Sequence, residues 1–82
     1  MGESAGKKTL HEIITLTEAD ESVVRVKQHF SMYLAPEEVV LQLMAIFKKD
    51  LTSKEISDAI KRIRKNIQEK FPDIRQIFIE PE

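Results

Sequence analysis

Residues 52–80, TSKEISDAIKRIRKNIQEKFPDIRQIFIE, decide the fold, because they predict a helix followed at once by a strand. Thr52 and Glu55 have the three-residue spacing of a capping box, which marks the start of a helix. Isoleucines then recur at intervals of four, three and four residues and form one apolar stripe: Ile56, Ile60, Ile63 and Ile67. Pro72 ends this helix, since proline cannot continue it, and residues 74–79 predict a strand.

Two more strands are predicted upstream of this unit. Residues 23–34 alternate in polarity and are rich in valine and aromatic residues, and a turn at 35–38 separates them from a second strand at 39–47. The alternation assigns to one face of the first strand Val24, Val26, Gln28, Phe30 and Met32. It assigns to the other face Arg25, Lys27, His29, Ser31 and Tyr33.

A first helix is predicted at residues 7–19, where Leu10, Ile13, Ile14 and Thr17 have the spacing of one buried helix face. Residues 1–6 are small and polar and are expected to form a tail or linker, so the domain is 7–82. The order α-β-β-α-β predicts an α+β two-layer sandwich, with two helices on one face of a three-stranded mixed sheet. A right-handed crossover makes the second and third strands parallel.

Length and composition limit the functions that the chain can have. Its 82 residues form one small domain, and 13 basic against 14 acidic residues give a net charge of −1. That balance provides no general attraction for nucleic acid, so we expect no nucleic-acid partner. The lack of cysteine removes disulfides, thiolate metal sites and cysteine nucleophiles. No apolar run is long enough to span a membrane and no signal peptide is visible, so this fragment is expected to be soluble.

Motifs that carry catalysis are missing from the sequence. It has no glycine-rich phosphate loop, no G-x-S-x-G elbow and no H-E-x-x-H motif, so we expect no enzyme. The basic residues at 61–65 stand between Asp58 and Glu69 on the predicted helix and indicate a solvated helix face. Neither His11 nor His29 has a second histidine nearby, and no metal site is expected. A site shared between two subunits, such as Glu80 with His29, is the alternative that stays open.

The second strand is apolar on both of its faces, which is unusual for a sheet with one wet face. One face holds Val39, Leu41, Leu43, Ala45 and Phe47. The other face, with a residue of the last strand, gives the predicted dimer interface: Val40, Gln42, Met44, Ile46 and Phe78. We expect self-association to cover this second face, because it is too apolar to face water. Coverage by the N-terminal tail is the alternative.

Several strings along the chain resemble one protein family in their order and spacing. They are Gly2-Glu3-Ser4, MYLAPEEV at 32–39, Asp50-Leu51-Thr52, IRKNIQEKFPD at 63–73 and IFIEP at 77–81. Together they make residues 2–82 resemble the cytoplasmic C-terminal domain of cation diffusion facilitator transporters, the cation efflux family. The resemblance implies a metallochaperone-like (ferredoxin-like) fold and a non-catalytic, regulatory homodimer. It also implies a covalently joined transmembrane domain that exports zinc or another divalent cation, with this domain at the cytoplasmic face of the membrane.

The sequence departs from that family at the positions where its members hold zinc between subunits. The family's histidines fall on Lys27, Met44, Ser57 and Phe78, and only Glu80 keeps a carboxylate. We therefore expect hydrophobic burial to hold the dimer where zinc holds it in relatives. About 500 Å² of apolar area would contribute roughly 12 kcal/mol before the costs of association. The alternative function is a free-standing soluble metal- or small-ligand-binding module of the same fold.

Overall fold

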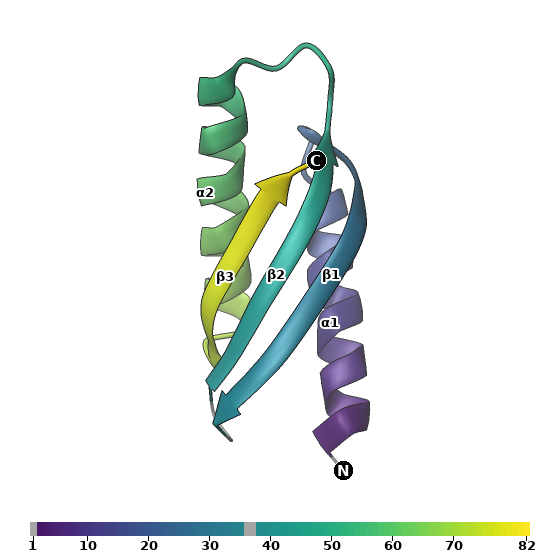
Figure 1. Ribbon diagram of the computed structural model, residues 1–82, viewed down its shortest axis with the longest axis vertical. Coiled ribbons are helices and arrows are strands. Elements are labelled where there is room, and N and C mark those ends of the chain that lie inside the picture. Colours follow the sequence, from purple (N-terminus) through teal and green to yellow (C-terminus); the bar gives the residue numbers. More distant parts are fainter. Residues whose placement is uncertain (1, 36–37) are drawn as a thin grey trace.

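The computed structural model describes residues 2–35 and 38–82, and the surroundings of the side chains at 8–32, 39–74 and 76–82. The elements follow the predicted α-β-β-α-β order (Figure 1). They are α1 (Gly2–Glu18), β1 (Val23–Ala35), β2 (Glu38–Phe47), α2 (Ser53–Lys70) and β3 (Ile74–Pro81). Both helices lie on the same side of the sheet, which confirms the predicted two-layer α+β arrangement.

The sheet is mixed, with β2 in the centre between β1 and β3. β1 pairs antiparallel with β2, as a hairpin requires, and β2 pairs parallel with β3. Helix α2 connects the two parallel strands, which is the crossover predicted from the sequence. This topology leaves β1 and β3 as the edge strands, and it leaves one whole face of the sheet away from the helices.

The core lies between the sheet and the two helices. Leu41 and Leu43 of β2 are almost completely buried and pack in one cluster with Ile13 of α1 and Ile63 and Ile67 of α2. Burying each of these side chains contributes about 1.5–3 kcal/mol, so this layer is the main source of stability. Thr17 is the polar member of the layer, and its hydroxyl donates to the carbonyl of Ile13 at 2.8 Å.

Helix α2 begins and ends where its sequence predicts. The amide of Thr52 donates to Oε1 of Glu55 at 2.8 Å, and the amide of Glu55 donates to Oγ1 of Thr52 at 3.1 Å, so the capping box is formed. At the other end the amide of Phe71 donates to the carbonyl of Ile67 at 2.7 Å, just before Pro72. Local signals therefore fix this helix at both ends.

The start of the first helix differs from the prediction. Helix α1 begins at Gly2, five residues before the predicted start at Lys7. Once the turns from Leu10 onward are fixed by packing, each added residue gains a backbone hydrogen bond without a new nucleation cost, so the helix continues through Gly6. The division into a 1–6 linker and a 7–82 domain stays a prediction.

The face assignment along β1 was wrong for part of the strand. The register shifts between Val23 and Arg25 and again between Val26 and Gln28. Such shifts insert an extra residue and break the simple alternation of faces. Val26 consequently pairs with the buried Ala45 and faces the helices, whereas Gln28 pairs with Met44 on the other face. The sequence alone placed both on one face.

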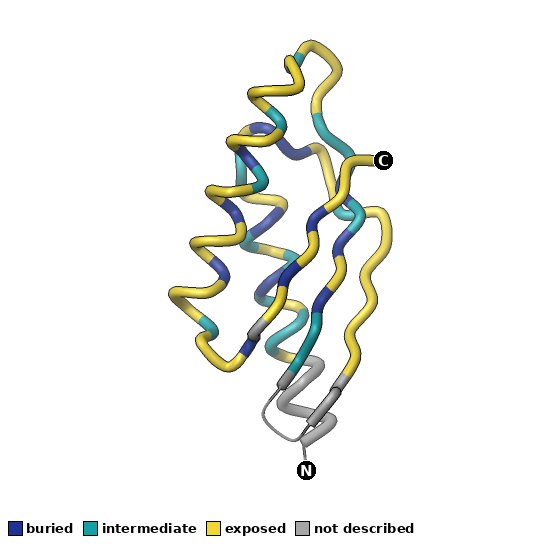
Figure 2. Tube along the Cα trace, turned by 60° about the vertical axis from the view of Figure 1, so that its left-hand side comes forward, coloured by how far each residue is buried: buried dark blue, intermediate teal, exposed yellow. Residues whose placement is uncertain are grey.

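Beyond the second shift, β1 is exposed on both of its faces. Every residue from 27 to 32 is exposed. In Figure 2 this run is exposed throughout, whereas β3 alternates between buried and exposed positions. His29 and Ser31 pair with the buried Leu43 and Leu41, so they lie on the helix side of the sheet without being covered. Phe30 and Met32 lie on the opposite side.

Candidate functional site

The sheet face opposite the helices, here called the open face, is the candidate site. The strand pairing assigns its residues without ambiguity, because directly paired residues point to the same side. β2 contributes Val40, Gln42, Met44 and Ile46. The edge strands contribute Arg25, Gln28, Phe30, Met32, Gln76, Phe78 and Glu80. The structure thus brings together on one face all five residues predicted for a dimer interface.

The open face exposes three large apolar side chains. Phe30 is 56% exposed, Phe78 is 51% exposed and Met32 is 45% exposed. Phe30 and Phe78 flank Gln42 in one row across the three strands. The apolar residues of β2, including Met44, are half-buried by these neighbours and form the floor. A contiguous exposed apolar patch of this kind is typical of an interaction surface.

Two polar groups of the open face, one on β2 and one on β3, are paired with each other. Nε2 of Gln42 donates to Oε1 of Glu80 at 2.9 Å, so the central amide and this carboxylate satisfy each other. At the end of the sheet where β3 stops, Lys27 forms an ion pair with Glu82, and the amide of Glu82 donates to the carbonyl of Ala45 at 3.0 Å. The C-terminal residues therefore connect the two edge strands across β2.

The structure does not bring together the two residues considered for a metal. His29 pairs with Leu43 on the helix side, whereas Glu80 pairs with Met44 on the open face. The sheet itself separates the two side chains, so one chain cannot use both on one cation. Among the residues that the structure describes, no group of three or more His, Asp or Glu side chains could hold a metal ion.

The N-terminal residues do not cover the open face. Residues 2–6 belong to α1, and α1 lies behind the sheet beside α2 in Figure 1. The alternative of a covering tail therefore has no support from this arrangement. Sequence reasoning missed Phe30 and Met32 as members of the patch. Counting back from the predicted turn pairs them with Leu43 and Leu41, whereas a register shift near the turn pairs them with Gln42 and Val40.

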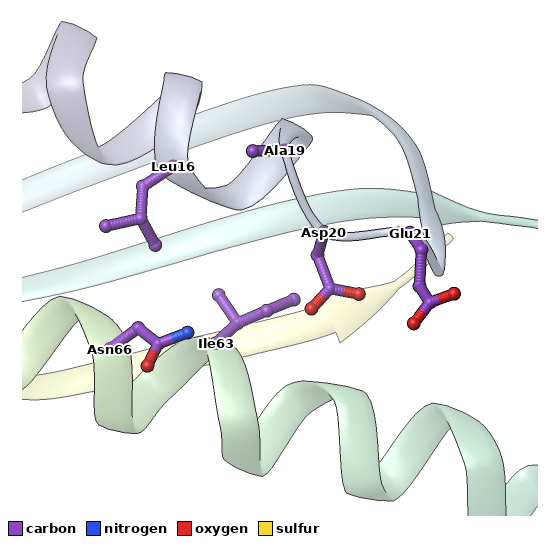
Figure 3. A pocket seen from close by; sticks show the side chains of 6 residues that line it. All are labelled: Leu16, Ala19, Asp20, Glu21, Ile63 and Asn66. Carbon is purple, nitrogen blue, oxygen red and sulfur yellow. The ribbon is translucent and has the colours of Figure 1, made fainter.

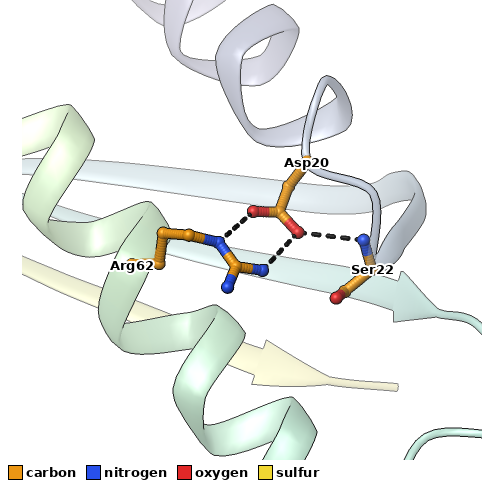
Figure 4. A network of polar contacts seen from close by, with 3 residues as sticks. All are labelled: Asp20, Ser22 and Arg62. Atoms are coloured by element: carbon orange, nitrogen blue, oxygen red, sulfur yellow. Dashed lines mark hydrogen bonds and ion pairs between the residues drawn. The ribbon is translucent and has the colours of Figure 1, made fainter.

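A second polar cluster joins the α1–β1 loop to α2 on the helix side (Figure 4). Arg62 of α2 donates from Nε to Oδ2 of Asp20 at 2.8 Å and from Nη2 to Oδ1 at 2.9 Å. The amide of Ser22 also donates to Oδ1 of Asp20 at 2.9 Å. The Arg62 hydrogen bonds hold the pKa of Asp20 below its ordinary value, and Asp20 in turn raises the pKa of Arg62. This network fixes the α1–β1 loop on α2.

An open depression of about 430 Å³ lies next to this network, between α1 and α2 (Figure 3). Its lining consists of Leu16, Ala19, Asp20, Glu21, Ile63 and Asn66. Ile63 belongs to the core, and Asp20 is already bound by Arg62. The depression thus offers no free set of converging groups for a ligand.

No helix in the described part of the chain is long and apolar enough to cross a membrane.

Comparison with solved structures places the fold among C-terminal domains of MamM. One variant of that domain has a TM-score of 0.87 at 13% identity and covers 96% of this chain and 95% of that chain. A nickel form of another variant has a TM-score of 0.84 at 12% identity, covering 93% and 95%. At such identities the likeness shows the fold alone, and it agrees with the resemblance in sequence, since MamM C-terminal domains are cation diffusion facilitator domains. No family model and no curated protein matches the chain.

Proposed function

We propose that this chain is the cytoplasmic, non-catalytic domain of a cation diffusion facilitator transporter and that it dimerises through the open face. The observation that carries the proposal is the agreement of two independent features. The fold matches MamM C-terminal domains over 96% of the chain, and the face left free by that fold exposes the large apolar side chains of Phe30, Met32 and Phe78. A regulatory domain of this kind acts by bringing two copies of its transporter together.

Hydrophobic contact holds this dimer without a metal. The centre of the open face presents Met44 and Phe78, whose side chains suit a dry interface and are poor ligands for a divalent cation. Burying exposed phenylalanine rings in a second copy supplies the largest apolar area available on this side of the sheet. Zinc or another divalent cation remains the cargo of the joined transmembrane domain.

A charge placed at the centre of the open face tests the interface. We expect Met44→Glu to weaken self-association by at least about 100-fold, because desolvating a carboxylate in an apolar interface costs several kcal/mol. Ser31→Glu is the matched control, since it adds the same charge to an exposed strand position on the helix side. Equilibrium sedimentation of both variants gives the dissociation constants. An unchanged dimer in Met44→Glu would refute this face as the interface.

The second candidate function is a soluble metal- or small-ligand-binding module of the same fold. The observation that favours it is that MamM C-terminal domains have been solved in nickel and copper forms. Titration calorimetry with zinc, nickel and copper on the unmodified chain separates the two functions. A stoichiometric, micromolar site would favour the binding module, and no heat of binding would favour the transporter domain.

A further inference from the structure

We propose that residues 28–32 of the edge strand β1, here called the edge segment, bind an extended peptide segment of a partner protein as an added antiparallel strand. The partner segment carries apolar side chains on the open-face side and small hydroxyl side chains on the helix side. The inference goes beyond the proposed dimer and does not rest on it, because the edge of β1 and the open face are different surfaces of the sheet.

The outward-pointing backbone groups of the edge segment belong to His29 and Ser31. The carbonyl of Ala45 in β2 accepts the amide of Glu82 at 3.0 Å, so the backbone of Ala45 points toward β3. Backbone direction alternates along a strand, so the β2 residues two and four positions earlier also point toward β3. Those residues pair with His29 and Ser31, whose amides and carbonyls therefore face away from β2. These groups have the spacing that a further strand requires.

Protection of the β1 edge ends where the edge segment begins. The amide of Val26 donates to Oε2 of Glu18 at 3.0 Å, so a side chain of α1 satisfies this edge position. The register then shifts between Val26 and Gln28, and such a shift also protects an edge from pairing. Within the edge segment the pairing is regular, and none of the side chains and loops that the structure describes bonds its outward groups. A regular strand edge of this kind is a template for pairing with another chain.

On the open face, Phe30 and Met32 provide apolar neighbours for an added strand. Their side chains are 56% and 45% exposed. Directly opposite side chains of an antiparallel pair lie about 4.5–5.5 Å apart, and aromatic residues pair favourably there with β-branched ones. A partner segment with valine or isoleucine at these positions therefore covers both side chains.

On the helix side, the added strand lies beside α1. Ile14 stands one turn before Glu18 and projects from the same side of α1. Because Glu18 reaches the edge at Val26, and α1 and β1 run in opposite directions, Ile14 lies toward the edge segment (Figure 1). Ile14 is half-buried, whereas His29 and Ser31 are exposed, so this side offers a small apolar contact among polar groups. Threonine suits such surroundings, since it combines a methyl group with a hydroxyl.

The size of the edge segment favours a peptide over a second copy of this chain. Stable interfaces between folded domains use about 20–30 residues a side, and the shift before Gln28 prevents β1 of a second copy from pairing regularly beyond the segment. Strand addition of a peptide needs less contact, because main-chain hydrogen bonds give the affinity and alternate side chains give the specificity. The partner is therefore an extended segment whose alternation matches the two sides of β1.

A peptide of that alternation tests the pairing without changing the protein. The probe is EVTVTVE with an amidated C-terminus and fluorescein at its N-terminus, and fluorescence anisotropy gives its dissociation constant. In the antiparallel pairing its threonines lie opposite His29 and Ser31 and bond through their amides. We expect methyl groups on both threonine amides to weaken binding at least about tenfold, because both hydrogen bonds are lost. Methyl groups on two valine amides, which point away from β1, are the matched control and should change binding less than about threefold.

A substitution at Ser31 tests the position on the protein. Ser31→Pro removes an outward amide and keeps the bonds of the β1–β2 ladder, so it is compatible with an edge strand. We expect it to weaken binding of the probe at least about tenfold, whereas Ser31→Ala keeps the amide and should bind within about threefold of the unmodified chain. Circular dichroism checks the folding of both variants. If Ser31→Pro does not fold, the two methylated peptides decide the question, because they leave the chain unchanged.

Weaker binding with methylated threonines and with Ser31→Pro supports strand addition at the edge segment. The proposal is overturned if the probe does not bind at about 1 mM protein, a concentration that detects even weak association. Equal binding of the two methylated peptides, or undiminished binding by a folded Ser31→Pro, also overturns it. If Ser31→Pro weakens self-association in the absence of the probe, a second copy occupies the edge and the proposal is wrong.

The same measurements on Met44→Glu keep this proposal distinct from the proposed dimer. We expect Met44→Glu to bind the probe within about threefold of the unmodified chain, because Met44 lies on β2 and not at the edge. Failure of Met44→Glu to weaken self-association would refute the proposed dimer and leave the edge segment unaffected. Failure of the probe to bind would refute the edge segment and leave the proposed dimer unaffected.

Discussion

The two faces of β2 have similar compositions and opposite surroundings. On the helix side Leu41, Leu43 and Ala45 are almost completely buried by the two helices. On the open face Val40, Met44 and Ile46 are only partly buried, and the exposed rings of Phe30 and Phe78 stand beside them. Apolar character in a central strand therefore has two different uses here. One face stabilises the fold of a single chain, and the other has association as its proposed use.

The largest expected effect is a difference in unfolding free energy between substitutions on the two faces of β2. Leu43→Ala removes a side chain with no exposed surface and is expected to lower the free energy of unfolding by about 2–5 kcal/mol. Met44→Ala, one position along the strand, should change it by less than about 1 kcal/mol in dilute, monomeric protein. Urea denaturation of both variants makes the comparison. Equal losses would mean that the two faces do not differ in their contribution to the fold.

Truncation of Phe30 should give the next largest effect, and the effect should appear in the dimer dissociation constant and not in the stability of the monomer. We expect Phe30→Ala to raise the dimer dissociation constant about 10- to 100-fold, because truncating a central aromatic residue in an interface typically costs 1–3 kcal/mol. Its stability as a monomer should stay within about 1 kcal/mol of the unmodified chain, since Phe30 is exposed there. Analytical ultracentrifugation measures the first quantity and urea denaturation the second. If the variant folds and its dissociation constant is unchanged, β1 is not part of the interface.

Asp20 lies on the helix side and should affect stability alone. Asp20→Ala loses the bonds to Arg62 and to the Ser22 amide, which we expect to cost about 1–2 kcal/mol because Arg62 is half exposed to solvent. The pKa of Asp20 is lower in the folded chain than its ordinary value of 3.8, so its contribution is present above that pH and is lost as the pH falls below it. The difference in unfolding free energy between the unmodified chain and Asp20→Ala, measured by urea denaturation, should be smaller at pH 3 than at pH 7. A difference that does not shrink would contradict this assignment.

The smallest effect concerns the cap of α2. Thr52→Ala removes the acceptor of the Glu55 amide and is expected to cost about 1 kcal/mol of unfolding free energy. Thr52→Ser keeps a hydroxyl at this position and should be nearly neutral. Because the cap is far from the open face, neither variant should change the dimer dissociation constant. A change in association would show that the two faces are coupled through the helix layer.

Local sequence signals predicted the parts of the fold that depend on nearby residues. The capping residues Thr52 and Glu55, the isoleucine spacing and Pro72 together set α2 and the parallel strand after it. The predicted start of α1 was wrong because helix propagation depends on a packed segment further along the chain. Shifts in register along β1 were missed because a bulge is determined by the partner strand and by burial, which short-range alternation does not contain.

The sequence predicted part of the candidate surface, and the rest depended on the register of β1. Residues 40, 42, 44 and 46 alternate on one regular strand, so their common face followed from the sequence, and Phe78 followed from the parallel pairing. Phe30 and Met32 depended on the shifted register of β1. The separation of His29 from Glu80 by the sheet depended on the same register, and only the structure established it.

The most direct test of metal-independent association is the molar mass of the unmodified chain by light scattering, at several concentrations, with EDTA and with added zinc. We predict a dimer at micromolar concentration in EDTA, with a dissociation constant that zinc does not change. A chain that is monomeric in EDTA and dimeric only with zinc would contradict this account, because it would require a shared metal site in place of an apolar interface.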